Sequence, residues 1–369
     1  MGKTPAFLPA GFADIPGWAE DDHVTAFHAF RRSAILSRER SWKDGALGVR
    51  FETLKPAFEA ACNLPAPDPA GARRFFETRF SPWRCPGEDG GGGLVTAYYE
   101  PEAEASPVRT SRFRYPLYRQ PADLVKIPAG SNPAGLHTSF EWARRAGDDL
   151  VEHPDRRAIE SGALEGRRLE LAWLEDRDEV FFIHVQGSAR LRMTDGRILR
   201  VGFAAKSGHP FTSIGRILVD AGEIDPAVVS MQSIRDWLHR HPHRRDDLVW
   251  RNRSFIFFRE TPLGDPELGP FAAGYVQLTP GRSVALDRKL HCFGTPVWID
   301  APGMTDFGGP FFRLMIGQDT GSAIVGAARA DLFAGTGPDA GRMAGAVKSP
   351  AGFWFLLPAG MVPPEAAVS

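Results

Sequence analysis

Residues 313–345 read RLMIGQDTGSAIVGAARADLFAGTGPDAGRMAG. An apolar strand ends at Gln318-Asp319-Thr320-Gly321, a short apolar turn follows, and the next segment carries Arg329 and Asp331. Glycines surround both acids, and glycine accepts positive φ and lets another chain, such as a sugar polymer, approach the backbone closely. The stretch therefore predicts a strand that ends at Asp319 and glycines that let another chain come close to both Asp319 and Asp331.

The rest of the chain predicts more short strands than long helices. Glycine (39) and proline (31) are both frequent, which favours turns. Further strands are expected at Leu94–Pro101, Glu179–Val185 and Phe353–Leu357, and Asp195-Gly196 predicts a hairpin. Because strands and helices do not alternate regularly, β-barrels are favoured over a doubly wound sheet. A length of 369 residues indicates two domains.

Helices are expected mainly in the first eighty residues. Asp21 and Asp22 are candidate caps for a helix with Val24, Phe27 and Phe30 on one side. Similar apolar spacing predicts helices over residues 51–61 and 72–80, and another over 228–238. These apolar stripes indicate core packing.

Charge and cysteine content exclude several classes of partner. Lys and Arg number 44 against 45 Asp and Glu, so no basic excess indicates nucleic-acid binding. Cys62, Cys85 and Cys292 lack metal-ligand spacing; a Cys62–Cys85 disulfide is one reading and three inert thiols the favoured one. The glycine-rich segment 87–93 lacks a P-loop ending and predicts a surface loop. No apolar run is long enough to span a membrane, and we expect neither cofactor nor metal.

Asp331 is the candidate general acid. It lies between Ala330 and Leu332-Phe333, and apolar neighbours raise a carboxyl pKa by desolvation, as proton donation to a glycosidic oxygen requires. The alternative is a structural role, in which Asp331 caps a turn or pairs with Arg329. Asp319-Thr320-Gly321 matches the aspartic-protease signature, but that mechanism needs two such loops and the chain has one.

Several motifs, in order along the chain, resemble those of the membrane-bound lytic murein transglycosylase A family. Segment 318–345 is similar to its three-aspartate domain, and the resemblance extends over about residues 94–358. The other matching segments are Thr96–Pro101, Phe182–Ala189, Gly208–Gly215, Asn252–Phe258 and Leu278–Asp287. Ala97 and Ala189 stand where the family has glycine.

The resemblance implies a mainly β fold with N-terminal helices. Residues 1–104 and 251–369 would form a double-psi β-barrel domain with the three-aspartate region at its C-terminal end. Residues 105–250 would form a smaller inserted β-barrel, with a glycan groove between the two.

The same resemblance implies a peptidoglycan lytic transglycosylase. It would cleave the β-1,4 bond from N-acetylmuramic acid to N-acetylglucosamine and leave 1,6-anhydro ends, with Asp331 as the single acid/base. Asp319, Asp287 and Arg329 would support it. The candidate substrate-binding residues are Tyr98, Tyr99, Gln186, Gly187, Ser188, Asn252, Phe257 and Ser283. For Phe257, core packing is the favoured alternative.

Two other functions stay open at this point. A glycoside hydrolase would use Asp331 as acid and Asp319 or Asp287 as base or nucleophile. A glycan-binding module would use the same barrel without cleavage. The family implies a monomer that binds peptidoglycan strands in the periplasm, with peripheral outer-membrane association allowed; this sequence shows no leader.

Overall fold

The computed structural model describes residues 7–87, 92–128, 130–131 and 133–363, so most of the expected glycine-rich loop lies outside the described residues. The chain divides into two compact units. Unit 1 is Met1–Tyr99 with Gly264–Ser369, and unit 2 is Glu100–Leu263. The sequence places the boundaries after residues 104 and 250 instead. The difference arises because β4 (Glu102–Ser106) and β12 (Ile256–Thr261) both pair with strands of unit 2.

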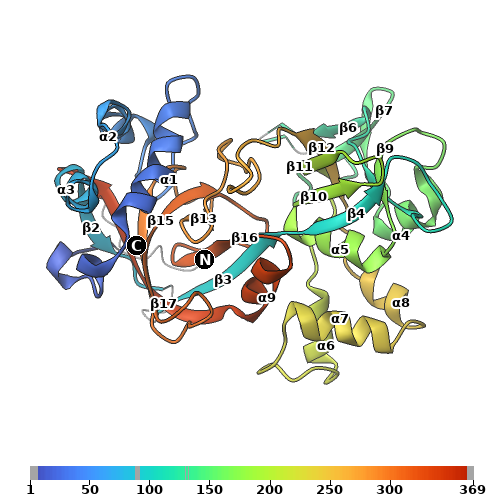
Figure 1. Ribbon diagram of the computed structural model, residues 1–369. Helices are drawn as coiled ribbons and strands as arrows, with labels where there is room; N and C mark the ends of the chain where they lie inside the picture. The colour runs from blue at the N-terminus through green and yellow to red at the C-terminus, as the bar shows by residue number, and fades with distance from the viewer. Residues whose placement is uncertain (1–6, 88–91, 129, 132, 364–369) are drawn as a thin grey trace. The chain divides into compact units, whose positions relative to one another are not determined.

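Unit 1 contains a sheet that closes on itself. Its strands are β1 (Leu8–Pro9), β2 (Phe80–Arg84), β3 (Gly93–Glu100), β13 (Ser283–Leu286), β14 (Pro296–Ala301), β15 (Phe311–Asp319), β16 (Arg329–Thr336) and β17 (Lys348–Pro358). The pairing order β17-β14-β15-β13-β16-β3 returns to its start because β3 also pairs with β17. This ring is the barrel that the sequence predicted, and Figure 1 shows its strands around one core.

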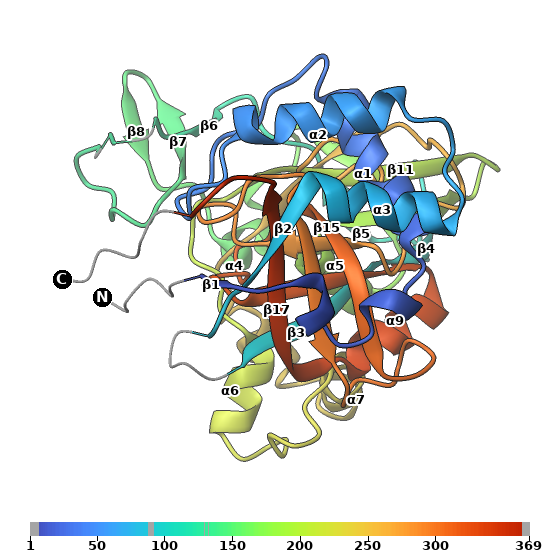
Figure 2. The same ribbon diagram turned by 90° about the vertical axis from the view of Figure 1, so that its left-hand side faces the viewer.

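Helices pack on the outside of this ring. Asp22 caps α1 (His23–Leu36) by accepting the Thr25 N–H, and Asp68 caps α3 (Pro69–Arg79). Together with α2 (Phe51–Asn63) they confirm the three expected N-terminal helices. Figure 2 shows α1, α2 and α3 beside β2, β15 and β17. A short helix, α9 (Pro338–Ala346), packs against β16.

Unit 2 contains a second curved sheet. Its order is β12-β11-β10-β4-β9-β5, formed with β5 (Tyr115–Tyr118), β9 (Glu170–Leu174), β10 (Ser188–Met193) and β11 (Ile198–Lys206). A bridge between Arg119 and Phe258 brings the edge near β5 against β12, so this sheet also curves back on itself. The expected hairpin joins β10 to β11, with Gly196 at a φ of 87°. Three further strands, β6 (Leu124–Lys126), β7 (Trp142–Ala146) and β8 (Asp149–Val151), make a separate sheet.

The expected strand at 179–185 is wrong, because this segment is helix α5 (Arg177–Gln186). Asp176 caps it by accepting the Asp178 N–H, two acids lie in its first turn, and Gly187 ends it with a φ of +79°. A short apolar run cannot by itself distinguish a buried strand from a buried helix, and here the capping residues decide. The other helices of unit 2 are α4 (Arg156–Ala158), the π-helix Ile159–Ala163, α6 (Ile214–Asp220), α7 (Met231–Arg240) and α8 (Arg245–Val249).

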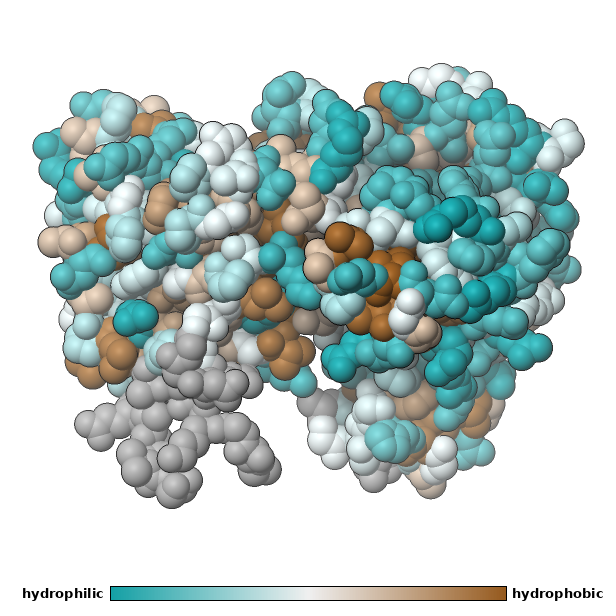
Figure 3. Space-filling view, turned by 90° about the horizontal axis from the view of Figure 1, so that it is seen from below, coloured by the Kyte–Doolittle hydropathy of each residue, from teal (hydrophilic) through white to brown (hydrophobic). Residues whose placement is uncertain are grey.

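The exposed surface mixes polar and apolar side chains, and the cysteines are unpaired. Figure 3 shows one face on which apolar areas are interspersed among hydrophilic side chains. Within the described ranges, no helix has the length and apolar character needed to cross a membrane. Cys62, Cys85 and Cys292 are free thiols, and burial raises the pKa of Cys85 and of Cys292 to about 12.

Candidate active site

Strand β3 presents two hydroxyl groups to two aspartates. Residues two apart on a strand share a face, so Thr96 and Tyr98 point to the same side. The Thr96 hydroxyl donates to Asp331 Oδ1, and the Tyr98 hydroxyl donates to Asp319 Oδ2 at 2.7 Å. One strand of unit 1 therefore holds both carboxylates.

The two aspartates lie on strands that flank β13. Ala285 of β13 is the register partner of Asp331 on antiparallel β16 and of Asp319 on parallel β15. Two strand spacings separate their backbones by roughly 10 Å. A small residue between them leaves room for the side chains of both acids on this face of the sheet.

Asp331 is half-buried, and its pKa is raised mainly by that burial. The hydrogen bond from Thr96 and the charge of Arg329 act in the opposite direction, whereas the negative charge of Asp319 raises the pKa further. Arg329 does not contact the carboxylate directly: it donates to Thr96 Oγ1 at 2.7 Å and to the Ala330 carbonyl. The neutral hydroxyl of Thr96 thus links the Arg329 guanidinium to the Asp331 carboxyl group.

Asp319 is held more tightly than Asp331. Besides Tyr98, it accepts the Ala273 N–H at 3.1 Å and the Thr320 N–H at 2.8 Å, both at Oδ1. Burial raises its pKa, and these donors lower it. Burial and the two aspartates raise the pKa of Tyr98 well above its usual value, so its hydroxyl stays a donor.

Asp287 fastens the loops around these acids. Its Oδ1 accepts the Lys289 N–H at 2.9 Å, and its Oδ2 accepts the Gly326 N–H at 3.0 Å. Gly326 belongs to the connection from Asp319 to Asp331, so Asp287 ties that connection to the end of β13. Its side chain is 7% exposed.

Several expected substrate-binding side chains lie inside the packed structure. Phe257 and Ser283 are 0% exposed, and Asn252 is 2% exposed. Ser283 donates to Gln318 Oε1 at 2.6 Å and accepts the Thr279 N–H, while the Asn252 side chain accepts the Thr212 N–H. The contacts that the structure gives these side chains are internal, and almost none of their surface is exposed. Tyr99 is also buried, and its ring lies against Gly341 of α9.

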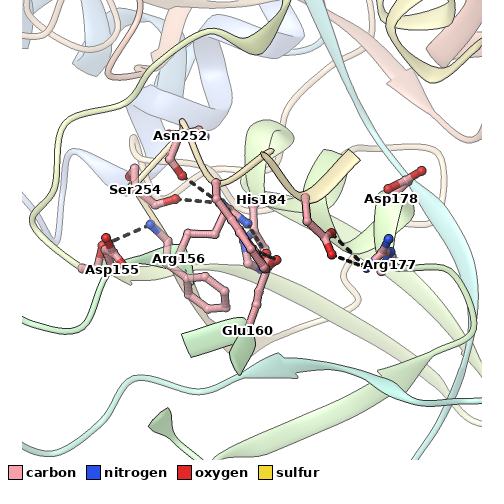
Figure 4. A network of polar contacts seen from close by, with 12 residues as sticks. Asp155, Arg156, Glu160, Arg177, Asp178, His184, Asn252 and Ser254 are labelled. Carbon is pink, nitrogen blue, oxygen red and sulfur yellow. Dashed lines mark hydrogen bonds and ion pairs between the residues drawn. The ribbon is translucent and has the colours of Figure 1, made fainter. Parts of the chain in front are cut away.

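Figure 4 shows the polar network around Asn252. The buried Arg156 guanidinium donates to the carbonyls of Asn252 at 3.0 Å and Ser254 at 2.7 Å, and to Glu160 at 3.0 Å. It also lies 3.3 Å from His184 Nδ1. This network joins α4 and α5 to the segment before β12 and gives Asn252 a structural role.

Gln186, Gly187 and Ser188 form the turn from α5 into β10 in unit 2. Gly187 ends the helix and Ser188 opens the strand opposite Gly202. Gln186 and Gly187 are half-buried, and Ser188 is 7% exposed. Gly187 has open space where a Cβ would project, so its glycine is explained by its positive φ.

Sequence reasoning did not single out Thr96, which is the hydrogen-bond donor to Asp331. The signal was available: once Tyr98 is placed on a strand next to the acids, Thr96 is the residue of the same face two positions earlier.

Comparisons with known proteins show the family of this chain. The family model described as the MltA specific insert domain matches residues 94–259, and the one described as the 3D domain matches residues 282–357. Membrane-bound lytic murein transglycosylase A of Escherichia coli K12 is 32% identical over 74% of this chain and 68% of its own length.

Solved structures agree with the sequence matches. The crystal structure of a membrane-bound lytic murein transglycosylase from Agrobacterium tumefaciens has a TM-score of 0.90 and 45% identity, covering 96% of this chain and 98% of the other. Escherichia coli MltA with bound chitohexaose has a TM-score of 0.61 and 28% identity, covering 84% and 82%. Fold and site thus define a lytic transglycosylase. The chain belongs to the membrane-bound lytic murein transglycosylase A family, as the sequence motifs predicted.

Proposed function

We propose that the protein cleaves the β-1,4 bond between N-acetylmuramic acid and N-acetylglucosamine in peptidoglycan, with Asp331 as its single acid/base. The names of its relatives support the reaction class. The chitohexaose bound to the Escherichia coli relative supports a β-1,4-linked amino-sugar polymer as ligand. We also propose that the enzyme works in the cell envelope, as its membrane-bound relatives suggest.

The observation that carries the proposal is the environment of Asp331. Burial raises its pKa, and its hydrogen-bond donor is the neutral hydroxyl of Thr96 rather than a guanidinium. Such a carboxyl can hold a proton closer to neutral pH than an ordinary aspartate, which a general acid must do.

In the proposed reaction, Asp331 first donates its proton to the glycosidic oxygen as the bond from C1 to that oxygen breaks. The resulting carboxylate then takes the proton of the C6 hydroxyl of the same muramyl residue. The C6 oxygen forms a new bond to C1, which gives the 1,6-anhydro ring and restores the protonated acid. No water is consumed, and attack within one sugar has an effective molarity that can reach ~10⁵ M or more.

Asp319 supports this one-carboxylate scheme rather than a second catalytic role. Its hydrogen bonds to Tyr98, Ala273 and Thr320 fix it in place, whereas a nucleophile would have to reach the sugar. We assign support of the site to Asp319, Asp287 and Arg329. Gln186, Gly187 and Ser188 remain proposed glycan contacts, as does Tyr98.

The test is digestion of purified murein in water enriched in the heavy oxygen isotope, followed by mass spectrometry. Anhydro ends without label are expected. Reducing ends that carry label would instead establish a glycoside hydrolase, and binding without any cleavage would establish a glycan-binding module.

A further inference from the structure

A short hairpin in unit 1 is fastened to the strand that carries Asp319. Its stem is closed by the hydrogen bonds from Gly269 N to Leu278 O at 2.8 Å and from Ala272 N to Val276 O at 3.1 Å. Its tip donates twice to β15: Ala273 N to Asp319 Oδ1 at 3.1 Å, and Gly274 N to Gln318 O at 2.9 Å. The tip is therefore positioned by the active site itself.

Tyr275 occupies a strained position at this tip. Its φ is 62°, and only Arg168 shares a positive φ among the non-glycine residues that the structure describes. In three-residue hairpins the left-handed position normally takes glycine or asparagine. Here the glycine comes one position earlier, where a Cβ on Gly274 would lie 2.5 Å from the Gln318 carbonyl oxygen. Backbone preference therefore does not explain a tyrosine, and such strain is concentrated at functional sites.

The Tyr275 side chain is presented to the surroundings. It is 46% exposed, and its hydroxyl has no hydrogen-bond partner in the described part of the chain. The guanidinium carbon of Arg40 lies 3.6 Å from the ring centroid, so it covers one face of the ring. An exposed aromatic ring with a free hydroxyl is suited to a ligand that has apolar faces and polar edges.

Arg40 adds an uncompensated positive charge. It lies in the turn after α1, where its N–H donates to the Leu36 carbonyl at 3.0 Å. Among the described residues, no carboxylate forms a salt bridge with it. Its guanidinium keeps donors for a carboxylate, which the planar fork of arginine binds in bidentate fashion.

We propose that Tyr275 and Arg40 form a specificity site for the muramyl residues of the glycan. The Tyr275 ring stacks on a sugar ring, and Arg40 binds the free lactyl carboxylate that N-acetylmuramic acid carries where no peptide is attached and that N-acetylglucosamine lacks. This inference rests on the proposed function, in that it takes the substrate to be a muramyl polymer. It makes the enzyme prefer an acidic glycan to a neutral one of equal length.

Binding is measured in the Asp331→Asn background, so that no ligand is cleaved. The ligands are a peptide-free tetrasaccharide of alternating N-acetylglucosamine and N-acetylmuramic acid, and neutral chitotetraose. We expect the parent to bind the acidic ligand more tightly. Tyr275→Ala should weaken both ligands roughly threefold to tenfold.

Arg40→Gln should weaken only the acidic ligand, by a similar factor. The matched control is Arg38→Gln, which removes the same charge from the same exposed turn, and Arg38 stacks on no aromatic ring of the described residues. It should change neither affinity. Unchanged binding in Tyr275→Ala, or an equal loss for both ligands in Arg40→Gln, would overturn the proposal.

Two further measurements separate recognition of the lactyl group from a structural role of Tyr275 and from recognition of a peptide. Tyr275→Gly should melt no lower than the parent, because glycine relieves the positive φ; a clear drop in melting temperature would make Tyr275 a structural residue and overturn the proposal. With a peptide-bearing tetrasaccharide, whose lactyl group is an amide, the effect of Arg40→Gln should vanish. A retained effect would refute the lactyl assignment in favour of a peptide carboxylate.

Cleavage of murein by the wild-type chain is recorded separately. An intact preference for the acidic ligand without anhydro products would refute the proposed reaction and support this binding site. Anhydro products without a preference for the acidic ligand would support the proposed reaction and refute this binding site.

Discussion

Each unit of the molecule contains a cluster of buried and half-buried charged side chains, but the charges of the two clusters have different partners. In unit 2, the buried Arg245 donates to Asp178 at 2.6 Å and to Asp246 at 2.8 Å, and these bonds raise its pKa despite the opposing effect of burial. Arg156 likewise meets Glu160 directly.

In unit 1, by contrast, Asp331 and Asp319 receive hydrogen bonds from hydroxyl and backbone N–H groups. Burial raises the pKa of both acids, and among the described residues no guanidinium forms a salt bridge with either carboxylate. A buried ion pair often adds little net free energy to folding, because desolvation offsets the attraction between the charges. A desolvated acid without a bound cation has a raised pKa, and such acids are frequent at functional sites. The comparison therefore distinguishes a cluster of ion pairs in unit 2 from two acids with raised pKa values in unit 1.

The largest expected effect is on the acid itself. Asp331→Asn should reduce murein cleavage at least ~10²–10⁴-fold, because amide nitrogen cannot donate the proton that the leaving oxygen needs. Melting temperature and chitotetraose binding should change little. Turnover is measured beside Asp339→Asn, an exposed aspartate of α9 that should behave like the parent. Near-normal turnover of Asp331→Asn would remove it from the mechanism.

Substitutions in the unit 2 cluster should lower the free energy of unfolding rather than the rate of cleavage. Arg156→Met leaves the buried carbonyls of Asn252 and Ser254 without their donor, and an unsatisfied buried acceptor costs about 1–3 kcal/mol. Glu160 loses one partner but keeps the hydrogen bond from Trp250. Urea unfolding measures the loss, with the exposed neighbour Arg157→Met as control. Turnover per folded molecule should stay unchanged. A stable variant that has lost activity would contradict the division between the two clusters.

Asp319→Asn tests whether Asp319 only supports the site or takes part in the reaction. Cleavage should remain measurable, lowered roughly twofold to tenfold by weakened hydrogen bonds. Removing this negative charge lowers the pKa of Asp331. Because the acid must be protonated, the upper limb of the pH–rate profile should move to lower pH. A loss as severe as that of Asp331→Asn would indicate a two-carboxylate hydrolase.

The smallest expected effect is a shift of the pH–rate profile in the opposite direction. Arg329 lowers the pKa of Asp331 through its charge, so Arg329→Gln should raise that pKa. The upper limb should then move to higher pH by a fraction of a unit, as measured on the same substrate. Shifts of both variants in one direction would show that charge does not tune Asp331.

The sequence predicted the parts of this picture that depend on local pattern. The capped N-terminal helices and the hairpin at Asp195-Gly196 needed only spacing and composition, whereas the roles proposed for Asp319 and Asp331 came from the resemblance to the family. Helix α5 was missed because its apolar run resembles a strand, and the signs of a helix lay in Asp176 and Gly187 at its ends.

Contacts between distant segments were harder to predict. The burial of Ser283 depends on Gln318, and that of Asn252 on the Arg156 network, neither of which follows from periodicity. Thr96 was missed for the same reason, since its partner lies on another strand. Motif residues can therefore hold the architecture of the molecule through contacts with segments that are distant in the sequence.

The ring of strands in unit 1 also dictates when the site can come into existence. Thr96 and Asp331 are 235 positions apart, and the whole of unit 2 is synthesised between them. Strand β3 meets its neighbours β16 and β17 only after nearly the entire chain has been made. Such long-range pairing folds slowly, because loop closure precedes the contacts that reward it. The contact between Thr96 and Asp331 therefore cannot form until the strands that follow unit 2 have been synthesised, so the order of synthesis delays assembly of the proposed site.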